Sequence, residues 1–453
     1  MKLNLEKIAK TLLLTLIFVL PFNFHYIFNF SATQDLLFFK ENLQYSLYFF
    51  DLLFLIIFPI WLFKKLKTPN FLKSNLLFIG LIVYLLGNSF FISSDFSTSL
   101  YNSLRLIEVL FFFLIFIDLA KNKKFFNQTV YLIFLAEVIQ AILALFQFIF
   151  QKSLGLKFLG ESILNPQTLG VAKLELHGEK FIRGYGTFPH PNLLGAFLFL
   201  ALICGLSFIL KNNFKIPFSL PDKFKKLNLT PKIKFLTGKI HFQAGLFLIL
   251  TGIIITFSRS VWLITALLGT ALFFQLLFTK KYRFKSVFKS VFPILIILMF
   301  LLFSFAKFIP ARLCFENCQD QSATLRQNYS QFSQKIIDNN FLTGIGPGQF
   351  VPIFKKINPQ NLPDWNLQPV HNIYLLAWSE IGLIGFLLLF FFILKNSSFS
   401  KINSQNQLFL FLIIGFLLLG FFDHYFWTLP QGQFIFWLSL ALFTTSGKIR
   451  DSM

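Results

Sequence analysis

The chain has 453 residues, of which 55% are hydrophobic, 19% are aromatic and only 13% carry a charge. Its mean hydropathy is +0.67, and such a composition excludes a soluble globular fold. The formal net charge of +22 comes from basic residues in short segments between apolar stretches. We therefore interpret the charge as a signal of membrane topology, and no nucleic-acid partner is expected.

Apolar stretches near the roughly 20 residues that a helix needs to cross a bilayer follow one another along the chain. The first is too long for a cleaved signal peptide, and its lysine-rich flank is typical of a start-transfer anchor. We expect an all-α polytopic membrane protein that forms one membrane domain over residues 1–453, with no internal repeat. Its predicted spans, about twelve in number, are 8–28, 45–63, 75–93, 100–119, 126–149, 190–210, 242–257, 261–279, 290–309, 370–394, 407–424 and 433–445.

The basic residues are distributed unequally between the two sides of this map. Of the 41 lysines and arginines, 27 lie on the side that holds both chain ends and the 211–239 loop. Because basic loops stay in the cytoplasm, both termini are predicted to be cytoplasmic. The lysine-rich 211–239 loop is typical of a segment that is attracted to anionic lipid headgroups.

Two long loops then lie on the outer face, a first outer loop at 151–189 and a large outer loop at 310–369. The first is too polar to span the membrane. In the second, TLRQNYSQFSQKIIDNN predicts a short amphipathic helix and TGIGPGQF predicts a turn. A loop of this length in a compact protein is usually functional when it is not disordered, and its aromatic and isoleucine content argues against disorder.

The arginines are distributed between the two sides differently from the lysines. Five of the seven lie on the outer side, and these are Arg105, Arg183, Arg259, Arg312 and Arg326. A guanidinium group binds phosphate oxygens in a bidentate way that an ammonium group cannot match. Arg259, in TFSRSVW, is interpreted as a ligand of either a lipid headgroup or a substrate phosphate. Arg326, in ATLRQ, is either a phosphate ligand or part of a solvated helical face.

The segment PVHNIYLLAWSEIGLIG places ionisable residues at the outer end of the predicted span 370–394. His371 can act as a general base near neutral pH, or it is an interfacial polar residue. Asn372 can hold a sugar or orient the imidazole. Glu380 is expected about 13 Å deeper at the rise of a helix. It must therefore pair with another helix or remain protonated.

Other polar residues give weaker signals. In FPHPN, His190 and Asn192 enter the predicted span 190–210, where His190 either joins a site or is a satisfied interfacial residue. Arg105 and Glu108 are three residues apart and are expected to neutralise each other on one helix. A transporter would favour a helix that is broken near the middle of the membrane, and we expect no such helix here.

No cofactor or metal ion is expected, because the acidic residues of the outer loops are scattered and form no cluster. Cys314 and Cys318, in CFENC, either form a short-loop disulfide in an oxidising compartment or stay free.

Six motifs in order resemble the bacterial O-antigen ligase and polymerase family. They are GTFPHPNLLG, TFSRS, ATLRQ, TGIGPGQF, HNIYLLAWSEIGLIG and DHYFWTLPQGQFIFWL. The resemblance covers about residues 180–440, and we assign the family-like core to 190–445. It implies a multi-helix glycosyltransferase of the GT-C type in the bacterial inner (plasma) membrane. Such a protein takes a glycan from undecaprenyl diphosphate at the outer face.

The resemblance also implies metal-independent transfer, in which His371 activates the acceptor hydroxyl while Arg259 and Arg326 hold the donor diphosphate. The expected partners are a polyprenyl-diphosphate-linked glycan donor, a lipid, glycan or protein acceptor, and membrane lipids. The motifs do not distinguish a ligase from a polymerase. A transporter of lipid-linked sugars and a non-catalytic envelope component are the alternatives. The expected substrate-binding residues are His190, Asn192, Asn372, Glu380 and Arg183.

Overall fold

The computed structural model describes residues 4–28, 45–210, 217, 231–278, 284–313, 321–357, 366–397, 399, 402 and 406–449. This part of the chain is mainly helical and includes two short antiparallel two-stranded sheets. Cys314, Cys318 and most of the predicted 211–239 loop lie outside the described residues, so the predictions made for them stay predictions.

A helix occupies each of the predicted spans. Six of these helices are long and apolar enough to cross a membrane: α5, α6, α7, the Gly238–Ile255 part of α9, α10 and α15. The number of spans and their orientation in the membrane stay predictions. The helices are α1 (Leu5–Val19), α2 (Phe49–Leu66), α4 (Leu76–Phe91), α5 (Phe96–Leu119), α6 (Lys123–Phe150), α7 (Pro191–Leu210), α9 (Pro231–Ile255), α10 (Arg259–Phe278), α11 (Phe284–Ser304), α15 (Ile373–Asn396), α16 (Gln407–Leu419) and α18 (Pro430–Ser446).

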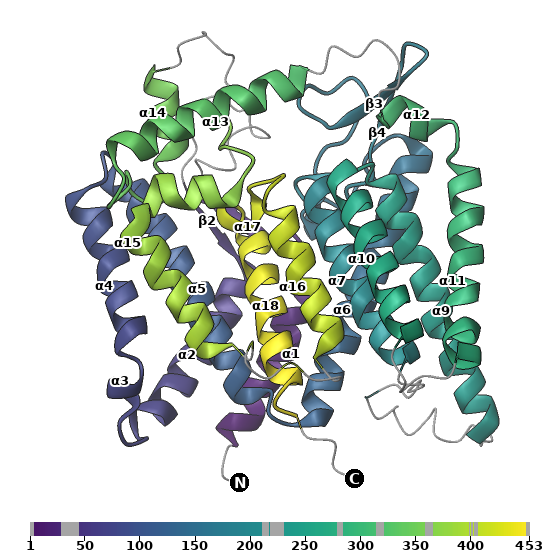
Figure 1. Cartoon of the computed structure of the whole chain (residues 1–453), viewed down its shortest axis with the longest axis horizontal. Helices are drawn as coiled ribbons and strands as arrows, with labels where there is room; N and C mark the ends of the chain where they lie inside the picture. Colours follow the sequence, from purple (N-terminus) through teal and green to yellow (C-terminus); the bar gives the residue numbers. More distant parts are fainter. Residues whose placement is uncertain are drawn as a thin grey trace.

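The remaining elements are short. In Figure 1, β3, β4, α12, α13 and α14 lie at one end of the bundle, and the first turn of α1 and the last turn of α18 lie at the other. The predicted amphipathic helix of the large outer loop is confirmed as α13, whereas the β3–β4 hairpin inside the first outer loop was not predicted. These elements are α3 (Phe71–Ser74), α12 (Phe308–Leu313), α13 (Gln321–Asn339), α14 (Phe350–Ile357), α17 (Tyr425–Thr428), η3 (Lys157–Leu159), β1 (His25–Ile27), β2 (Ser46–Tyr48), β3 (Lys173–Leu176) and β4 (Glu179–Ile182).

The first helix is shorter than the predicted span 8–28. It ends at Val19, and the chain turns into β1, which pairs with β2. Pro21 cannot donate the next helical hydrogen bond because it has no N–H group. Its carbonyl oxygen accepts a hydrogen bond from Thr187 Oγ1 at 2.9 Å instead. The end of α1 is thereby joined to the first outer loop.

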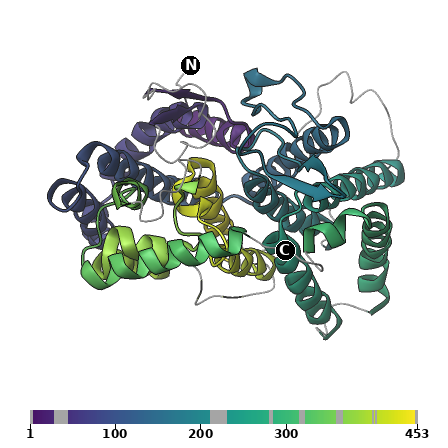
Figure 2. The same ribbon diagram turned by 90° about the horizontal axis from the view of Figure 1, so that it is seen from above.

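The helices form two groups with a central wall between them, as Figures 1 and 2 both show. The α15 side consists of α2 to α5 and α13 to α15. The α7 side consists of α6, α7, α9 to α12, β3 and β4. Helices α16, α17 and α18 stand between these sides, where α18 packs against α5 and α16 packs against α7 and α10.

Helix α15 is broken at Gly382, whose φ of 60° and ψ of −176° are not helical. A Cβ atom at this position would overlap the carbonyl oxygen of Leu342, so only glycine fits. Figure 1 shows that the outer part of α15 lies across the bundle, while the part after the break runs along it. This corrects one prediction, because a broken helix is present. The break follows Glu380, so the depth of about 13 Å predicted for Glu380 stays a prediction.

The predicted TGIGPGQF turn is confirmed, and it supplies the backbone partners that the break in α15 requires. The amide groups of Ile345 and Gly346 donate to the carbonyl oxygens of Ser379 and Glu380 at 3.0 and 2.9 Å. Beyond the break, the amide of Leu383 donates to the carbonyl oxygen of Phe341 at 3.0 Å. Turn and break therefore form one hydrogen-bonded unit.

A second pair of elements is tied together in the N-terminal part of the chain. The predicted Arg105–Glu108 pair is confirmed, with Nη1 of Arg105 lying 2.9 Å from the Glu108 carboxylate. Asp51 of α2 also pairs with Arg105, at 2.7 Å. All three side chains are at most 13% exposed, so this ion triad joins α2 to α5 inside the bundle.

Candidate active site

A chain of polar contacts leads from the first outer loop to the central helices. Arg183, just after β4, is 4% exposed and donates from Nη2 to Asn192 Oδ1 at 2.6 Å. Its Nε donates to the carbonyl oxygen of Thr256 at 2.5 Å. Asn192, at the start of α7, then donates from Nδ2 to Asp423 Oδ2 at 2.8 Å. The structure thus brings the predicted site residues Arg183 and Asn192 together with Asp423, which was not predicted to belong to the site.

Two buried glutamines of α6 hold this segment of the first outer loop in place. The Gln147 side chain accepts from the Gly186 amide at 2.8 Å and donates to its carbonyl at 2.7 Å. The Gln140 carbonyl oxygen accepts from the Thr187 amide at 2.9 Å. Because buried amides need partners, this pairing selects one loop conformation. Arg183 and Asn192 are therefore placed by a membrane helix.

His371 lies beside a second histidine, His424, which precedes α17. Their ring centroids are 4.9 Å apart and the planes are nearly perpendicular. His371 also stacks on Tyr329 of α13, and its Nδ1 is 3.2 Å from the Pro369 carbonyl oxygen. With the proton on Nδ1, His371 donates to that carbonyl, and Nε2 is left to accept a proton. In this tautomer Nε2 of His371 can act as the predicted base.

Asp423 completes a three-residue cluster with these histidines. One ligand atom from each of His371, Asp423 and His424 lies within 4.8 Å of the others, and this arrangement can hold a metal ion. This cluster was not predicted, because Asp423 was placed inside the predicted span 407–424. In the structure α16 ends at Leu419, and Asp423 and His424 lie in the turn that follows. Transfer without a metal ion stays the prediction.

The electrostatics of the cluster favour neutral imidazoles beside a carboxylate. Burial lowers the pKa of His371 to about 3, and the neighbouring His424 and Arg326 act in the same direction while Asp423 opposes them. Burial, with the Arg183 guanidinium, also lowers the pKa of His190 to about 3. Burial works against ionisation of Asp423, but the facing imidazoles and the Asn192 amide lower the pKa of its carboxyl group.

Three of the arginines predicted for the outer face, Arg183, Arg259 and Arg312, act electrostatically on one another near this chain of contacts. Arg259 is the first residue of α10, and Arg312 of α12 donates from Nε to the Phe257 carbonyl oxygen at 2.7 Å. Burial, followed by the positive charges of Arg312 and Arg259, lowers the pKa of Arg183 to about 9. Three like charges that repel one another form a strong attraction for an anion. Arg326 of α13 acts electrostatically on both His371 and His424.

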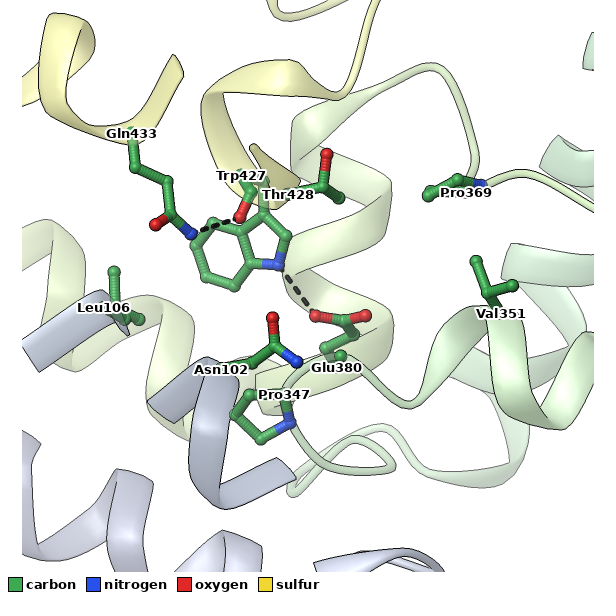
Figure 3. A pocket seen from close by; sticks show the side chains of 10 residues that line it. Asn102, Leu106, Pro347, Val351, Pro369, Glu380, Trp427, Thr428 and Gln433 are labelled. Carbon is green, nitrogen blue, oxygen red and sulfur yellow. Dashed lines mark hydrogen bonds between the residues drawn. The ribbon is translucent and has the colours of Figure 1, made fainter. Parts of the chain in front are cut away.

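Asn372 and Glu380 have protein partners of their own. The Asn372 side-chain oxygen caps α15 by accepting from the amides of Tyr374 and Leu375 at 3.0 and 3.1 Å. This gives Asn372 a structural role, and its predicted contact with a sugar stays a prediction. Glu380 is 3% exposed. Its Oε2 accepts from Trp427 Nε1 at 2.8 Å, as Figure 3 shows. The pairing with another helix predicted for Glu380 is thus present.

Comparison with known proteins bears on the segment that contains most of these residues. No curated protein matches the chain. Residues 244–390 match a family model described as O-Antigen ligase. That segment includes Arg259, Arg326, His371 and Glu380, whereas Arg183, His190, Asn192 and Asp423 lie outside it. The match confirms the resemblance predicted from the six motifs: residues 244–390 carry the sequence pattern of the O-antigen ligase family.

Proposed function

We propose that this membrane protein transfers a glycan from an undecaprenyl-diphosphate-linked donor to an acceptor hydroxyl at the outer face of the bacterial inner membrane. The family match supports an O-antigen ligase or polymerase type of activity in general. The finer proposal rests on one observation. His371 lies beside the buried carboxylate of Asp423, and Asn192 joins that carboxylate to Arg183.

The arginines are the proposed site of the donor diphosphate. A diphosphate gains negative charge as its bond to the sugar breaks, and guanidinium groups that are already in place stabilise that charge. Arg183 is held by Thr256 and Asn192, so little ordering is needed when the donor binds. Arg259, at the start of α10, and Arg312, in α12, act on the same anion. Arg326 approaches from α13, beside His371.

His371 is the proposed general base. Its Nε2 takes the proton of the acceptor hydroxyl while that oxygen bonds to the anomeric carbon. The bond from this carbon to the diphosphate oxygen breaks in the same step, and the diphosphate leaves with the electron pair. Asp423 stabilises the imidazolium that forms, as a carboxylate beside a catalytic histidine does in other enzymes. The anomeric configuration is inverted, and no metal ion takes part.

A transporter of lipid-linked sugars is the main alternative, and the broken helix α15 is a feature that such a transporter would have. In a transporter, the free backbone groups at the break bind the substrate. Here the groups beside Gly382 are hydrogen-bonded to the 341–346 turn. We therefore favour the transferase.

The test is transfer by the purified protein in lipid nanodiscs, with labelled lipid-linked saccharides extracted from the source cells. We expect release of undecaprenyl diphosphate by the wild type and release at least about 100-fold slower by His371→Ala. His177→Asn is the matched control, because His177 is exposed in the β3–β4 turn. A ladder of lengthening chains identifies a polymerase, and one transfer to lipid or protein identifies a ligase. If the wild type consumes no donor with any acceptor, the proposal is wrong.

A further inference from the structure

The cluster between the two sides of the site has the ligand types of a transition-metal site. One ligand atom from each of His371, Asp423 and His424 lies within 4.8 Å of the others. Two imidazoles and one carboxylate are the protein ligands of one class of catalytic zinc site, and also of the facial triad that binds iron. Both kinds of site leave a coordination position open. A metal ion in the cluster would therefore keep a position for water or for a substrate oxygen.

Each imidazole of the cluster has a ring nitrogen that is available for a metal ion. Nδ1 of His371 carries a proton in the tautomer that donates to the Pro369 carbonyl oxygen, so Nε2 keeps its lone pair. Nδ1 of His424 lies 2.8 Å from Thr428 Oγ1. That hydroxyl donates its own proton to the His424 carbonyl oxygen at 3.3 Å, so it accepts from Nδ1 of the ring. Nε2 of His424 is therefore free as well.

The same hydrogen bonds supply the outer shell that a metal site needs. A histidine that binds a metal ion almost always donates its other N–H group to an oxygen atom, which fixes the ring. His371 and His424 both do so. Asp423 is oriented by Asn192 Nδ2 at 2.8 Å and by the His424 backbone amide at 2.9 Å. Because a carboxylate accepts about four hydrogen bonds, Asp423 has capacity left for a metal ion.

Access and charge decide which metal ions suit the cluster. The two imidazoles are partly exposed, whereas Asp423 is only 6% exposed. The Asp423 carboxylate attracts a cation, and the positive charge of Arg326, which acts on both histidines, opposes it. Two imidazole ligands favour ions such as Zn²⁺ and Co²⁺, and one carboxylate supplies too few oxygen ligands for Mg²⁺ or Ca²⁺. The cluster therefore suits a transition-metal ion that binds reversibly.

We infer that Zn²⁺ binds to His371, Asp423 and His424 and thereby inhibits transfer. The metal ion takes the lone pair of His371 Nε2, so this nitrogen can no longer accept the proton of the acceptor hydroxyl. It also neutralises the Asp423 carboxylate, which then no longer stabilises an imidazolium. The inhibition rests on the proposed function, in which His371 is the base, whereas the binding of the metal ion does not. Transfer itself stays independent of metal ions.

Binding is measured first, without any substrate. The protein is purified through a tag that contains no histidine, placed in nanodiscs and titrated with Co²⁺, whose visible absorption reports its ligands, and Zn²⁺ is then added to displace the Co²⁺. We expect Thr428→Val to lower the affinity about 10- to 100-fold, the usual effect of losing an outer-shell partner. His424→Gln should lower it further. His177→Asn, which replaces an exposed histidine, should bind as the wild type does. Thermal unfolding shows whether each variant is folded.

Inhibition is measured with the lipid-linked saccharides of the transfer assay. Zn²⁺ should slow transfer by the wild type and by His177→Asn at the concentrations at which it binds, and a chelator should restore the rate. Each variant is compared with its own rate without added metal. For Thr428→Val and His424→Gln, the Zn²⁺ concentration that halves the rate should rise by the factor by which binding weakens. Mg²⁺ also binds diphosphates in solution but should not inhibit, which excludes capture of the donor as the cause.

The results separate this inference from the proposed function. If the wild type transfers glycan but binds Co²⁺ and Zn²⁺ no better than His424→Gln does, the inference is overturned and the proposed function stands. If Zn²⁺ binds to the cluster and the rate stays unchanged or rises, the inhibition is overturned, and with it the role of His371 as the base. Farnesyl diphosphate, a sugar-free relative of the donor, probes the arginines. If Co²⁺ binds as expected but the wild type neither binds farnesyl diphosphate nor consumes donor, the metal site stands and the proposed function is wrong.

Discussion

The two sides of the candidate site differ in charge and in how they are held. On the α7 side, backbone carbonyls hold Arg183 and Arg312, Asn192 of α7 also holds Arg183, and the charge of Arg259 acts on Arg183. On the α15 side, Glu380 offers hydrogen-bond acceptors, and Arg326 of α13 brings a positive charge that acts on His371 and His424. The histidine cluster stands between them. A site divided in this way can hold an anionic donor and an acceptor hydroxyl without exchanging them.

Replacing the residue between the two sides should have the largest effect. We expect His371→Ala to lower the rate of transfer by about 10²- to 10⁴-fold, the usual contribution of a general base. Binding of farnesyl diphosphate should be unchanged, because the arginines remain. Single-turnover transfer and equilibrium binding measure the two quantities. A loss of diphosphate binding in this variant would mean that the two sides are not separate.

Replacing an arginine of the α7 side should affect the donor alone. We expect Arg183→Gln to lower kcat by about 10²- to 10³-fold, as loss of a group that stabilises a developing charge does, and to raise KM for the donor. Arg183→Lys should fall between this variant and the wild type, since it keeps the charge without the bidentate geometry. Steady-state kinetics with varied donor measure this. An equal change in KM for the acceptor would contradict the division.

Removing the break in α15 should disturb the α15 side first. Gly382→Ala places a side chain in a backbone conformation that only glycine adopts easily, at a cost of about 1–3 kcal/mol. We expect a lower thermal unfolding temperature and slower transfer. Gly80→Ala in α4 is the control, because no atom lies within 4 Å of the added Cβ. Equal behaviour of the two variants would show that the break does not support the α15 side.

The pH dependence should separate catalysis from stability. Burial lowers the pKa of His371 from 6.5 to about 3, so the base stays unprotonated as the pH falls from 8 to 5. We expect kcat/KM for transfer to be flat over that range. In the unfolded chain His190 and His371 each bind a proton near pH 6.5. In the folded chain each binds its proton only near pH 3. The free energy of unfolding should therefore decrease as the pH falls from 6.5 to 3. Each histidine should lower it by up to about 1.4 kcal/mol for each pH unit.

A loss of activity centred near pH 6.5 would contradict the expected burial of His371. Thermal unfolding between pH 7 and pH 4 provides the second measurement, and it does not depend on activity.

Metal removal should have the smallest effect. We expect treatment with a chelator to leave transfer unchanged, since the arginines neutralise the diphosphate. Loss of transfer that added Zn²⁺ or Mn²⁺ restores would mean that His371, Asp423 and His424 hold a metal ion that transfer requires. The measurement is turnover before and after dialysis against a chelator, with metal content determined on the same samples.

Much of the fold follows from hydrophobicity, since a described helix occupies each predicted apolar stretch. The uneven distribution of the arginines, five of seven on the predicted outer side, also led to Arg183, Arg259 and Arg326. Asp423 and His424 were missed because apolar residues run on past the end of α16, which hid the turn that follows Leu419. The break at Gly382 was missed because a single glycine is tolerated in a helix. Only its contact with the turn around Leu342 makes it necessary.

The β3–β4 hairpin was within reach of sequence reasoning. The segment KLELHGEKFI alternates apolar and polar residues around His177 and Gly178, which is a hairpin pattern. The identity of the partner of Glu380, which is Trp427, was not within reach, because no pattern in the sequence pairs α15 with α17.

The hydrogen-bonded unit of the 341–346 turn and the broken α15 has a consequence for the evolution of the family. Its amides and carbonyls pair residue by residue, from Phe341 with Leu383 to Gly346 with Glu380. Adding or deleting one residue in either segment shifts every pair and moves Glu380 away from Trp427. Related chains should therefore keep the lengths of TGIGPGQF and of the HN-to-IGLIG segment in step, although twenty residues lie between them.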